Sequence, residues 1–179
     1  FGLISVADKL VPWYLGSEFE PTTYAIMLIS PIVISNTLSG ISGSQYFTAT
    51  NQITILVKSQ FFAAAANIVI NAILIPNYGF YGAAIATLIT SFLCAIVQYS
   101  YMLKQIKMPG LIKELVKYLL VSILMFGVVR ALTGNWEATP TTNILQILIG
   151  GTTYIGACIL LKDTQLKLVI EKARKMLSK

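Results

Sequence analysis

The sequence predicts an all-α fold, a bundle of membrane-spanning helices, and two observations support this prediction. Hydrophobic residues make up 56% of the 179 residues and charged residues 11%, with a mean hydropathy of +0.75, whereas about a quarter of the residues in soluble domains are charged. In addition, Lys58 is the only charged residue between Pro21 and Leu103. A soluble core cannot use that much apolar surface, so we expect an integral membrane protein embedded in a lipid bilayer.

Apolar runs separated by polar or Pro/Gly-containing breaks predict five complete transmembrane helices, each close to the ~20 residues that a bilayer core requires. The predicted spans are about 22–47, 53–75, 80–103, 114–132 and 142–161. Residues 1–15 resemble the end of a further helix, because the chain starts at Phe1 without a methionine or a basic leader segment. We therefore expect five complete spans plus one truncated span, from the C-terminal part of a longer protein.

The first complete span is predicted to be kinked and unusually polar. Pro31 removes a backbone hydrogen bond in its middle, and Gly40 and Gly43 weaken the helix further. Its polar side chains include the amides Asn36 and Gln45 among several serines. We expect these groups to face other helices or water, because polar groups that face lipid remain unsatisfied.

The second and third spans are predicted to form a helical hairpin. Residues 76–79, Pro-Asn-Tyr-Gly, indicate a tight turn between them. The third span then begins with small residues at helical spacing, which allow another helix backbone to approach closely where lipid supplies no hydrophobic drive for association. The residues expected to serve this packing are Gly79, Gly82, Ala83 and Ala86.

Basic residues orient the predicted spans. If the basic segment 104–117 lies in the cytoplasm, alternation of the loops places eleven of the thirteen Lys and Arg on the cytoplasmic side, and only Lys9 and Arg130 are left outside. The expected domains are a transmembrane bundle over 1–161 and a cytoplasmic basic tail over 162–179. The tail repeats apolar residues at helical spacing, so we expect an amphipathic helix on the anionic inner leaflet. Its alternative role is docking of a cytoplasmic partner.

The composition excludes several classes of function. The chain has no His, and its spans hold no Asp or Glu away from their ends, whereas a membrane enzyme needs a nucleophile, an acid–base group or a metal at the reacting bond. Cys94 and Cys158 lie inside apolar segments, so buried packing is expected rather than a disulfide framework. Membrane topology explains the net charge of +6. We therefore expect no catalytic residue, no cofactor, no metal and no nucleic-acid partner.

The informative polar residues are amides. Asn67 and Asn71 are four residues apart and share one face of the second span, and Asn36 and Gln45 belong to the kinked span before it. One interpretation is hydrogen bonding between helices, which contributes about 1 kcal/mol per bond or less. The other is a hydrated cavity lined by neutral groups, suited to a sugar-bearing substrate. The sequence leaves both interpretations open.

Two basic residues also admit two interpretations. Lys58, at the predicted cytoplasmic end of the second span, either extends its ammonium group to the membrane surface or contacts a phosphate group that enters from the cytoplasm. Arg130, near the outer end of the fourth span, has the same two interpretations. The candidate residues of a substrate cavity are thus Asn36, Gln45, Lys58, Asn67, Asn71 and Arg130.

The segment 67–87 resembles a known family. Its pattern N-x-x-x-N-x-x-L-I-P-x-Y-G-x-x-G-A-A-x-A-T is similar to the C-terminal half of polysaccharide repeat-unit flippases of the Wzx type. The sequences Tyr-Leu-Gly-Ser-Glu-Phe at 14–19 and Ala-Thr-Asn at 49–51 agree with this resemblance. These flippases belong to the MATE-like (MOP) superfamily, which also holds the multidrug (MATE) exporters and the lipid II flippase.

The resemblance implies a two-lobe transporter that rocks in alternating access, in which this chain supplies most of the second lobe and pairs with an N-terminal lobe of the same protein. It further implies that the substrate is an undecaprenyl-diphosphate-linked oligosaccharide, moved across the bacterial cytoplasmic membrane for capsule, exopolysaccharide or O-antigen synthesis. A cation-coupled MATE-type exporter is an alternative, although such exporters commonly use an intramembrane carboxylate, which these spans lack. A membrane-embedded glycan polymerase or acyltransferase is a further alternative, but the predicted outer loops are short and nearly bare.

Overall fold

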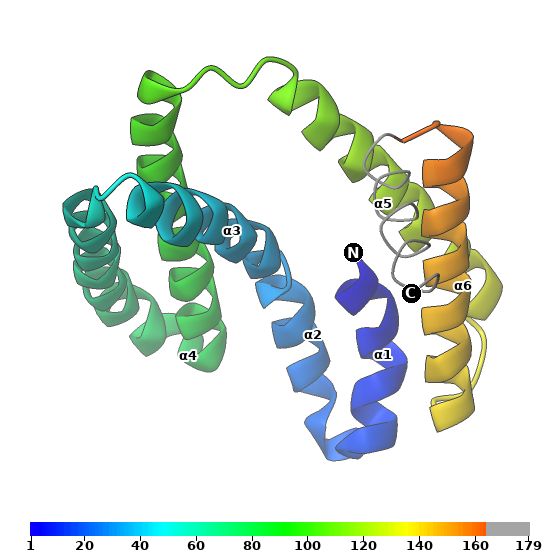
Figure 1. The fold of residues 1–179 in the computed structure, drawn as a ribbon. Helices are drawn as coiled ribbons and strands as arrows, with labels where there is room; N and C mark the ends of the chain where they lie inside the picture. Colours follow the sequence, from blue (N-terminus) through cyan, green and yellow to red (C-terminus); the bar gives the residue numbers. More distant parts are fainter. Residues whose placement is uncertain (164–179) are drawn as a thin grey trace, which may run out of the picture. The chain divides into compact units, whose positions relative to one another are not determined.

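In a computed structural model, the chain is described over residues 1–163, apart from the side chain of Ile112, and all regular structure in this range is helical (Figure 1). The helices are α1 Gly2–Tyr14, η1 Ser17–Phe19, α2 Glu20–Ile29, α3 Ile32–Ser39, η2 Gly40–Phe47, α4 Ile53–Gln105, α5 Leu111–Thr133 and α6 Pro140–Leu160. The all-helical prediction is confirmed for this range. Most of the predicted amphipathic tail, from residue 164 onward, lies outside the described residues.

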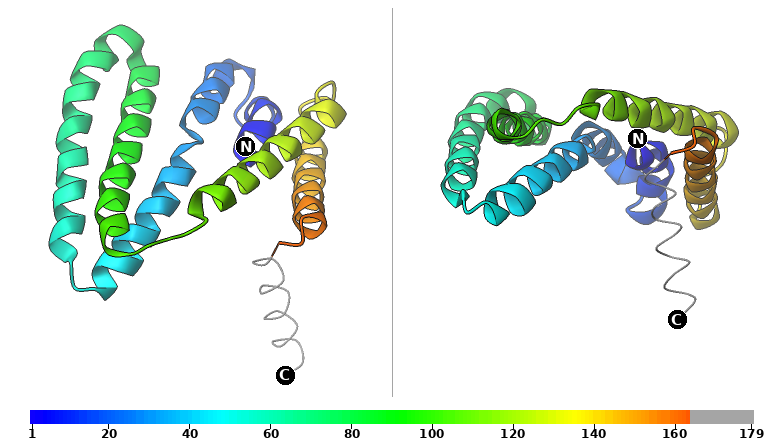
Figure 2. Two further views of the ribbon diagram at one scale, coloured as in Figure 1. Left: turned by 90° about the horizontal axis from the view of Figure 1, so that it is seen from above. Right: turned by 45° about the horizontal axis from the view of Figure 1, so that its top comes forward.

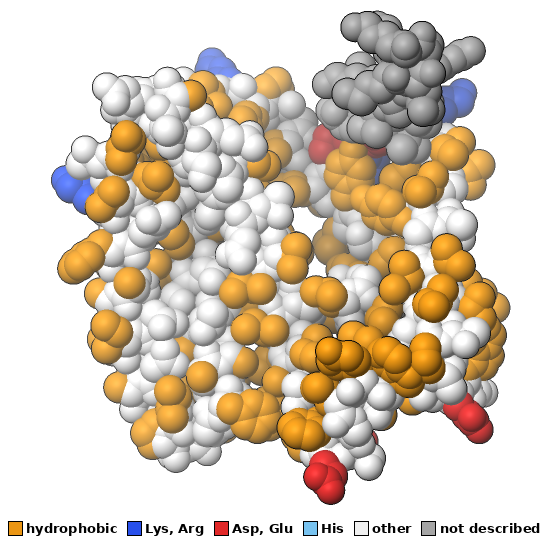
Figure 3. Space-filling view, turned by 60° about the horizontal axis from the view of Figure 1, so that its bottom comes forward, with side chains coloured by type: hydrophobic (Ala, Val, Ile, Leu, Met, Phe, Trp, Pro, Cys, Tyr) orange, Lys and Arg blue, Asp and Glu red, His pale blue; other side chains and the backbone are white. Residues whose placement is uncertain are grey.

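Among the described residues, three helices are long and apolar enough to cross a membrane: α4, most of α5, and α6. A fourth candidate is the bent pair formed by residues 17–29 and 32–47, if the pair counts as one span. Large apolar side chains are exposed along these helices, including Phe61, Ile68 and Leu160, and Figure 3 shows hydrophobic side chains spread over the surface. The helices indicate a membrane protein, while five complete spans plus a truncated one remain a prediction.

The chain divides into two compact units. One unit combines Phe1–Glu20 with the chain from Leu111 onward, and the other is the continuous segment Pro21–Gly110. Each has its own helix packing and its own buried polar groups.

The centre of the Pro21–Gly110 unit is the helical hairpin made by α4. Gly79 has φ 54° and ψ −133°, and at this residue the helix folds back so that its two arms lie side by side (Figures 1 and 2). The Asn67 amide donates a hydrogen bond of 3.0 Å to the Thr90 hydroxyl across the two arms. Only glycine adopts a positive φ of this kind without strain, which explains why the predicted reversal at 76–79 falls on its last residue.

The kink predicted at Pro31 is also present. The helices on either side of the break at residues 30 and 31 are bent by 41°, and α3 begins directly after Pro31. The chain then continues as the π-helix η2, in which Thr48 N–H bonds the carbonyl of Gly43 five residues earlier. A π-helical segment within an α-helical span is rare and often marks a functional place.

A buried glutamine connects η2 to the hairpin. Gln98 is fully buried; its carbonyl accepts a hydrogen bond of 2.9 Å from Ser42, and its amide donates one of 2.9 Å to Ser59. A Cβ on Gly43 would come within 3.2 Å of the Gln98 carboxamide oxygen and 2.7 Å of Leu56. The small residue at 43 therefore allows η2 to reach Gln98.

In the other unit, α1, α5 and α6 pack against one another around Ala7, Val11 and Val129, which are almost fully buried. Arg130 of α5 forms an ion pair with Asp8 of α1, in which both side chains are less than half exposed. Cys158 is buried here and Cys94 in the other unit, and both thiols are free, as predicted.

Polar side chains tie the ends of the helices together within each unit. In the Pro21–Gly110 unit, Gln52 and Gln105 exchange two amide hydrogen bonds of 2.8 Å, while at the bend the Tyr81 hydroxyl donates to the Pro21 carbonyl. In the other unit, Lys9 donates to the Gly134 carbonyl at one end. At the other end, Lys117 pairs with Asp163 at 2.5 Å. Within each unit, these contacts place together the helix ends that loop alternation assigns to the same side.

We predict that Gly82→Ala lowers the thermal stability of the protein in detergent. A Cβ at Gly82 would lie 2.5 Å from the carbonyl oxygen of Leu74 on the opposite arm, and overpacking of this kind costs about 1–3 kcal/mol. Gly127→Ala in α5 is the matched control, since nothing lies within 4 Å of a Cβ at that position. The control should keep or slightly raise the melting temperature, and equal melting temperatures for the two variants would contradict the close approach.

We also predict that Asp8 and Arg130 are energetically coupled. Either Asp8→Asn or Arg130→Gln alone leaves a partly buried charge without its partner. The losses of stability in the two single variants should therefore add up to more than the loss in the double variant. A double-mutant cycle on unfolding should give a coupling energy of about 0.5–3 kcal/mol. Additive effects of the two changes would show that the ion pair contributes nothing.

Candidate functional site

The Pro21–Gly110 unit holds an open cavity of about 390 Å³ between α3 and the two arms of α4. The lining comes from three segments of the chain that the kink at Pro31 and the bend at Gly79 place together. The lining residues are Asn36 and Ser39 from α3, Gln60, Ala63, Ala64 and Asn67 from the first arm, and Thr87, Thr90, Ser91 and Cys94 from the second arm. Amides, hydroxyls and small side chains form this surface, and none of the lining residues is charged.

Two of the predicted cavity residues, Asn36 and Asn67, thus lie in one cavity. Asn36 is exposed to it, and within the described part of the chain no protein group hydrogen-bonds its side chain. Asn67 donates to Thr90 and accepts a hydrogen bond of 2.8 Å from the amide of Asn71. Asn71 therefore lies behind the lining and orients Asn67, while its own carboxamide oxygen is buried without a partner among the described residues.

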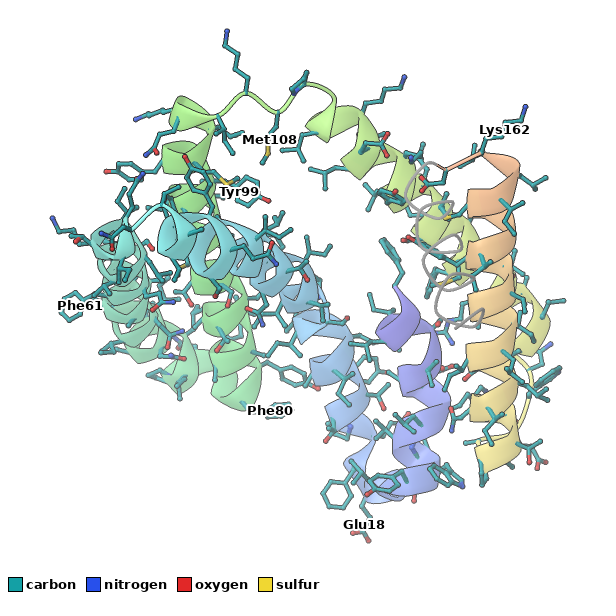
Figure 4. The ribbon with its side chains drawn as sticks, in the orientation of Figure 1. Glu18, Phe61, Phe80, Tyr99, Met108 and Lys162 are labelled. Atoms are coloured by element: carbon teal, nitrogen blue, oxygen red, sulfur yellow. The ribbon has the colours of Figure 1, made fainter. Side chains whose placement is uncertain are left out.

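Asn36, Asn67 and Asn71 therefore fit in part both interpretations of the sequence, hydrogen bonding between helices and a hydrated cavity. Asn67 and Asn71 do bridge the arms of the hairpin, as the packing interpretation expects. Asn36 and Ser39 of α3 face Gln60 and Asn67 of the first arm across an open space. The next residue after Gln60 shows the contrast, because Phe61 points away from the unit (Figure 4) and is 77% exposed. One arm thus has a polar face on the cavity and an apolar face directed outward.

Lys58 does not line this cavity. It lies in a separate hollow of about 370 Å³, lined by Thr54, Ile55, Lys58, Ser59, Phe62, Val97 and Tyr101. Lys58 and Asn67 are nine residues apart on one α-helical arm, and nine steps of about 100° equal two and a half turns, so their side chains lie on opposite faces. The structure therefore separates the lysine from the amides.

The remaining two candidates also lie elsewhere. Gln45 is on the exposed side of η2 and is not part of the cavity lining. Arg130 belongs to the other unit, where it pairs with Asp8 and stacks its guanidinium 5.9 Å from the centre of the Phe126 ring. The four packing candidates are placed on the hairpin: Gly79 at the bend, Gly82 against the backbone of Leu74, Ala86 fully buried, and Ala83 partly buried.

Sequence reasoning missed Gln98 and its partners beside the cavity. Gln98 donates weakly to the sulfur of Cys94, a lining residue, at 3.4 Å. The sequence did contain a usable signal, the four-residue spacing of the second arm, because the structure buries the residues at every fourth position. These residues are Gly82, Ala86, Thr90, Cys94, Gln98 and Met102. The small-residue face identified at its start thus continues through Gln98.

The cavity offers hydrogen-bond donors and acceptors without fixed charge. Carboxamides carry two donors and an acceptor, and hydroxyls both donate and accept. Such groups can replace water around a neutral, hydroxyl-rich ligand and provide no strong attraction for a small ion. The chemistry of this lining therefore favours a polar, uncharged ligand such as a sugar.

No protein-family model matches the chain, and no solved structure matches it. Among curated proteins, the chain is 23% identical over 150 residues to a protein of Haloferax volcanii named probable low-salt glycan biosynthesis flippase Agl15. The match covers 84% of this chain and 31% of that relative, so the chain spans about a third of the relative's length. The similarity supports a relationship to flippase-like membrane proteins, and membership of the MATE-like superfamily remains a prediction.

Proposed function

We propose that this chain is part of a membrane transporter that moves a lipid-linked glycan across a bilayer. The observation that carries the proposal is the uncharged, amide- and hydroxyl-lined cavity within helices that are otherwise apolar. The distant similarity to a protein named a glycan biosynthesis flippase supports it. Because the chain covers about a third of that relative, the complete transport path includes further segments.

The main energetic cost of such transport comes from the glycan, because its hydroxyl groups lose their hydration when they enter hydrocarbon. Asn36, Asn67 and Ser39 are placed to exchange hydrogen bonds with these hydroxyls as water leaves. A lipid tail can remain in the bilayer meanwhile, since it gains nothing from entering a polar cavity. The cavity thus lowers the barrier for the polar part of the substrate alone.

In its most specific form, the proposal names undecaprenyl-diphosphate-linked oligosaccharide repeat units as the substrate and the bacterial cytoplasmic membrane as the location. The chain would be most of the second lobe of a MATE-like transporter, with the C-terminus in the cytoplasm. The motif between Asn67 and Thr87 supports this form. The distribution of Lys and Arg, which alternation places mostly on one side, supports the orientation.

Asn36→Leu should reduce glycan transport while the protein remains folded. The side chain of Asn36 has no hydrogen bond to lose among the described residues, so the substitution costs only the bonds that this side chain makes to the substrate, about three- to tenfold in rate. The measurement is the appearance of lipid-linked glycan at the outer leaflet, detected with a lectin in cells that depend on the full-length protein.

The matched control is Asn77→Leu, which removes an amide at the bend whose one side-chain hydrogen bond among the described residues goes to the Ile73 carbonyl of its own helix. This variant should transport normally when expressed at the same level. Equal transport by Asn36→Leu and the unchanged protein would remove the glycan-binding role of the cavity. A matching loss in both variants would point to folding instead.

Cysteine labelling should show that the cavity is hydrated. After Cys94 and Cys158 are replaced by alanine, Ala64→Cys should react with a membrane-impermeant thiol reagent, because Ala64 lines the cavity. Ala65→Cys is the control, since it is exposed on a neighbouring face outside the lining. A reagent that labels neither position from either side of the membrane would mean that the cavity is closed to water.

A further inference from the structure

The hollow around Lys58 is a second candidate binding place, and it lies on the face of the first arm opposite Asn67. Its volume is about 370 Å³, and both arms of α4 contribute to its lining. Lys58 is exposed, and no ion pair to it is formed among the described residues. Thr54 and the hydroxyl of Tyr101 provide further hydrogen-bonding groups at its edge.

The charge around this hollow is entirely positive within its own unit. Segment Pro21–Gly110 contains Lys58, Lys104 and Lys107 and no Asp or Glu. Lys104 lies 5.4 Å from the centre of the Tyr101 ring, which lines the hollow. Lys58 and Tyr101 thus line one hollow and Lys104 lies beside that tyrosine, without a carboxylate of the unit to neutralise the two lysines. An anion is the ligand that this arrangement favours.

The rest of the hollow is apolar. Ile55, Phe62 and Val97 line it, and Phe62 is 54% exposed. An inorganic anion would leave these surfaces uncovered, whereas a molecule with a charged head and a hydrocarbon tail covers both parts. The lysine is near one end of an apolar hairpin, which is the depth at which basic side chains meet lipid headgroups.

We propose that this hollow binds the phosphate headgroup of an anionic membrane phospholipid, with an acyl chain lying along Phe62 and Val97. Lys58 provides the charge, and Tyr101 and Thr54 provide hydrogen bonds to the phosphate. The site is distinct from the glycan cavity, because Lys58 and Asn67 face away from each other on the same arm. The lipid thus stabilises the hairpin from the membrane side and is not cargo. This proposal does not depend on the transport function.

The test is native mass spectrometry of the full-length protein with added phosphatidylglycerol or, as the neutral probe, phosphatidylcholine. The protein should retain phosphatidylglycerol preferentially, and Lys58→Gln should weaken that binding about fivefold, the contribution expected of one basic side chain near an anionic lipid. Lys58→Arg should preserve the binding. Lys107→Gln is the control, because it removes the same charge from the linker after α4 and does not line the hollow.

Because Lys58 is exposed, all these variants should fold, and melting temperatures in detergent without added lipid should agree. Added phosphatidylglycerol should then raise the melting temperature of the unchanged protein more than that of Lys58→Gln. Equal lipid binding by these two proteins would overturn the proposal, as would equal losses in Lys58→Gln and Lys107→Gln. Displacement of the lipid by soluble pyrophosphate, together with lost transport by Lys58→Gln in neutral membranes, would assign Lys58 to a substrate diphosphate instead.

Discussion

The packing of the Pro21–Gly110 unit depends on the burial of one carboxamide. Gln98 is inaccessible to solvent and satisfies its polar atoms with Ser42, Ser59 and Cys94. A carboxamide left unpaired in an apolar interior costs several kcal/mol, so η2 and the first arm of α4 are held where their hydroxyls meet it. The cavity lies beside this cluster and shares Cys94 with it, so the cluster helps to fix the shape of the cavity.

In the second unit, an ion pair and a hydrogen bond join the helices. Arg130 pairs with one carboxylate oxygen of Asp8 between α5 and α1, and Gln146 of α6 donates a hydrogen bond of 3.0 Å to Thr133. Asn143, which precedes Gln146 on α6, is also buried, and neither polar atom of its side chain has a hydrogen-bond partner within the described part of the chain. Polar contacts thus connect all three helices of this unit, in a solvent where apolar side chains gain nothing by meeting one another.

The sequence predicted the features that depend on neighbouring residues. The apolar runs gave the helices, Pro31 gave the break, and the segment ending at Gly79 gave the reversal. It also predicted that Asn36 and Asn67 belong together, since both are polar residues in apolar spans. The separation of Lys58 from Asn67 could also be predicted from the sequence, because a spacing of nine residues on a helix places two side chains on opposite faces.

The pairing of distant helices was not available from the sequence. Asp8 and Arg130 are 122 positions apart, and periodicity identifies a helix face without naming the helix that packs on it. For this reason the sequence names Arg130 as a cavity candidate with two open interpretations and does not identify Asp8, the acid with which the structure pairs it. Gln98 was overlooked because the face of small residues was followed only from Gly79 to Ala86, although its four-residue spacing continues to Gln98.

The π-helix η2 has a consequence for how this protein can be compared with others. A π-helix holds about one more residue per turn than an α-helix, so the segment Gly40–Phe47 is, in terms of chain length, an α-helical span with an insertion. A homologue one residue shorter here can close the segment as a regular α-helix, and the helices on either side largely keep their faces, because the π-helical turns absorb the extra residue. Such a homologue keeps both the membrane span and the direction of Asn36 toward the hairpin, so a single gap in an alignment at this place would not by itself indicate a different cavity.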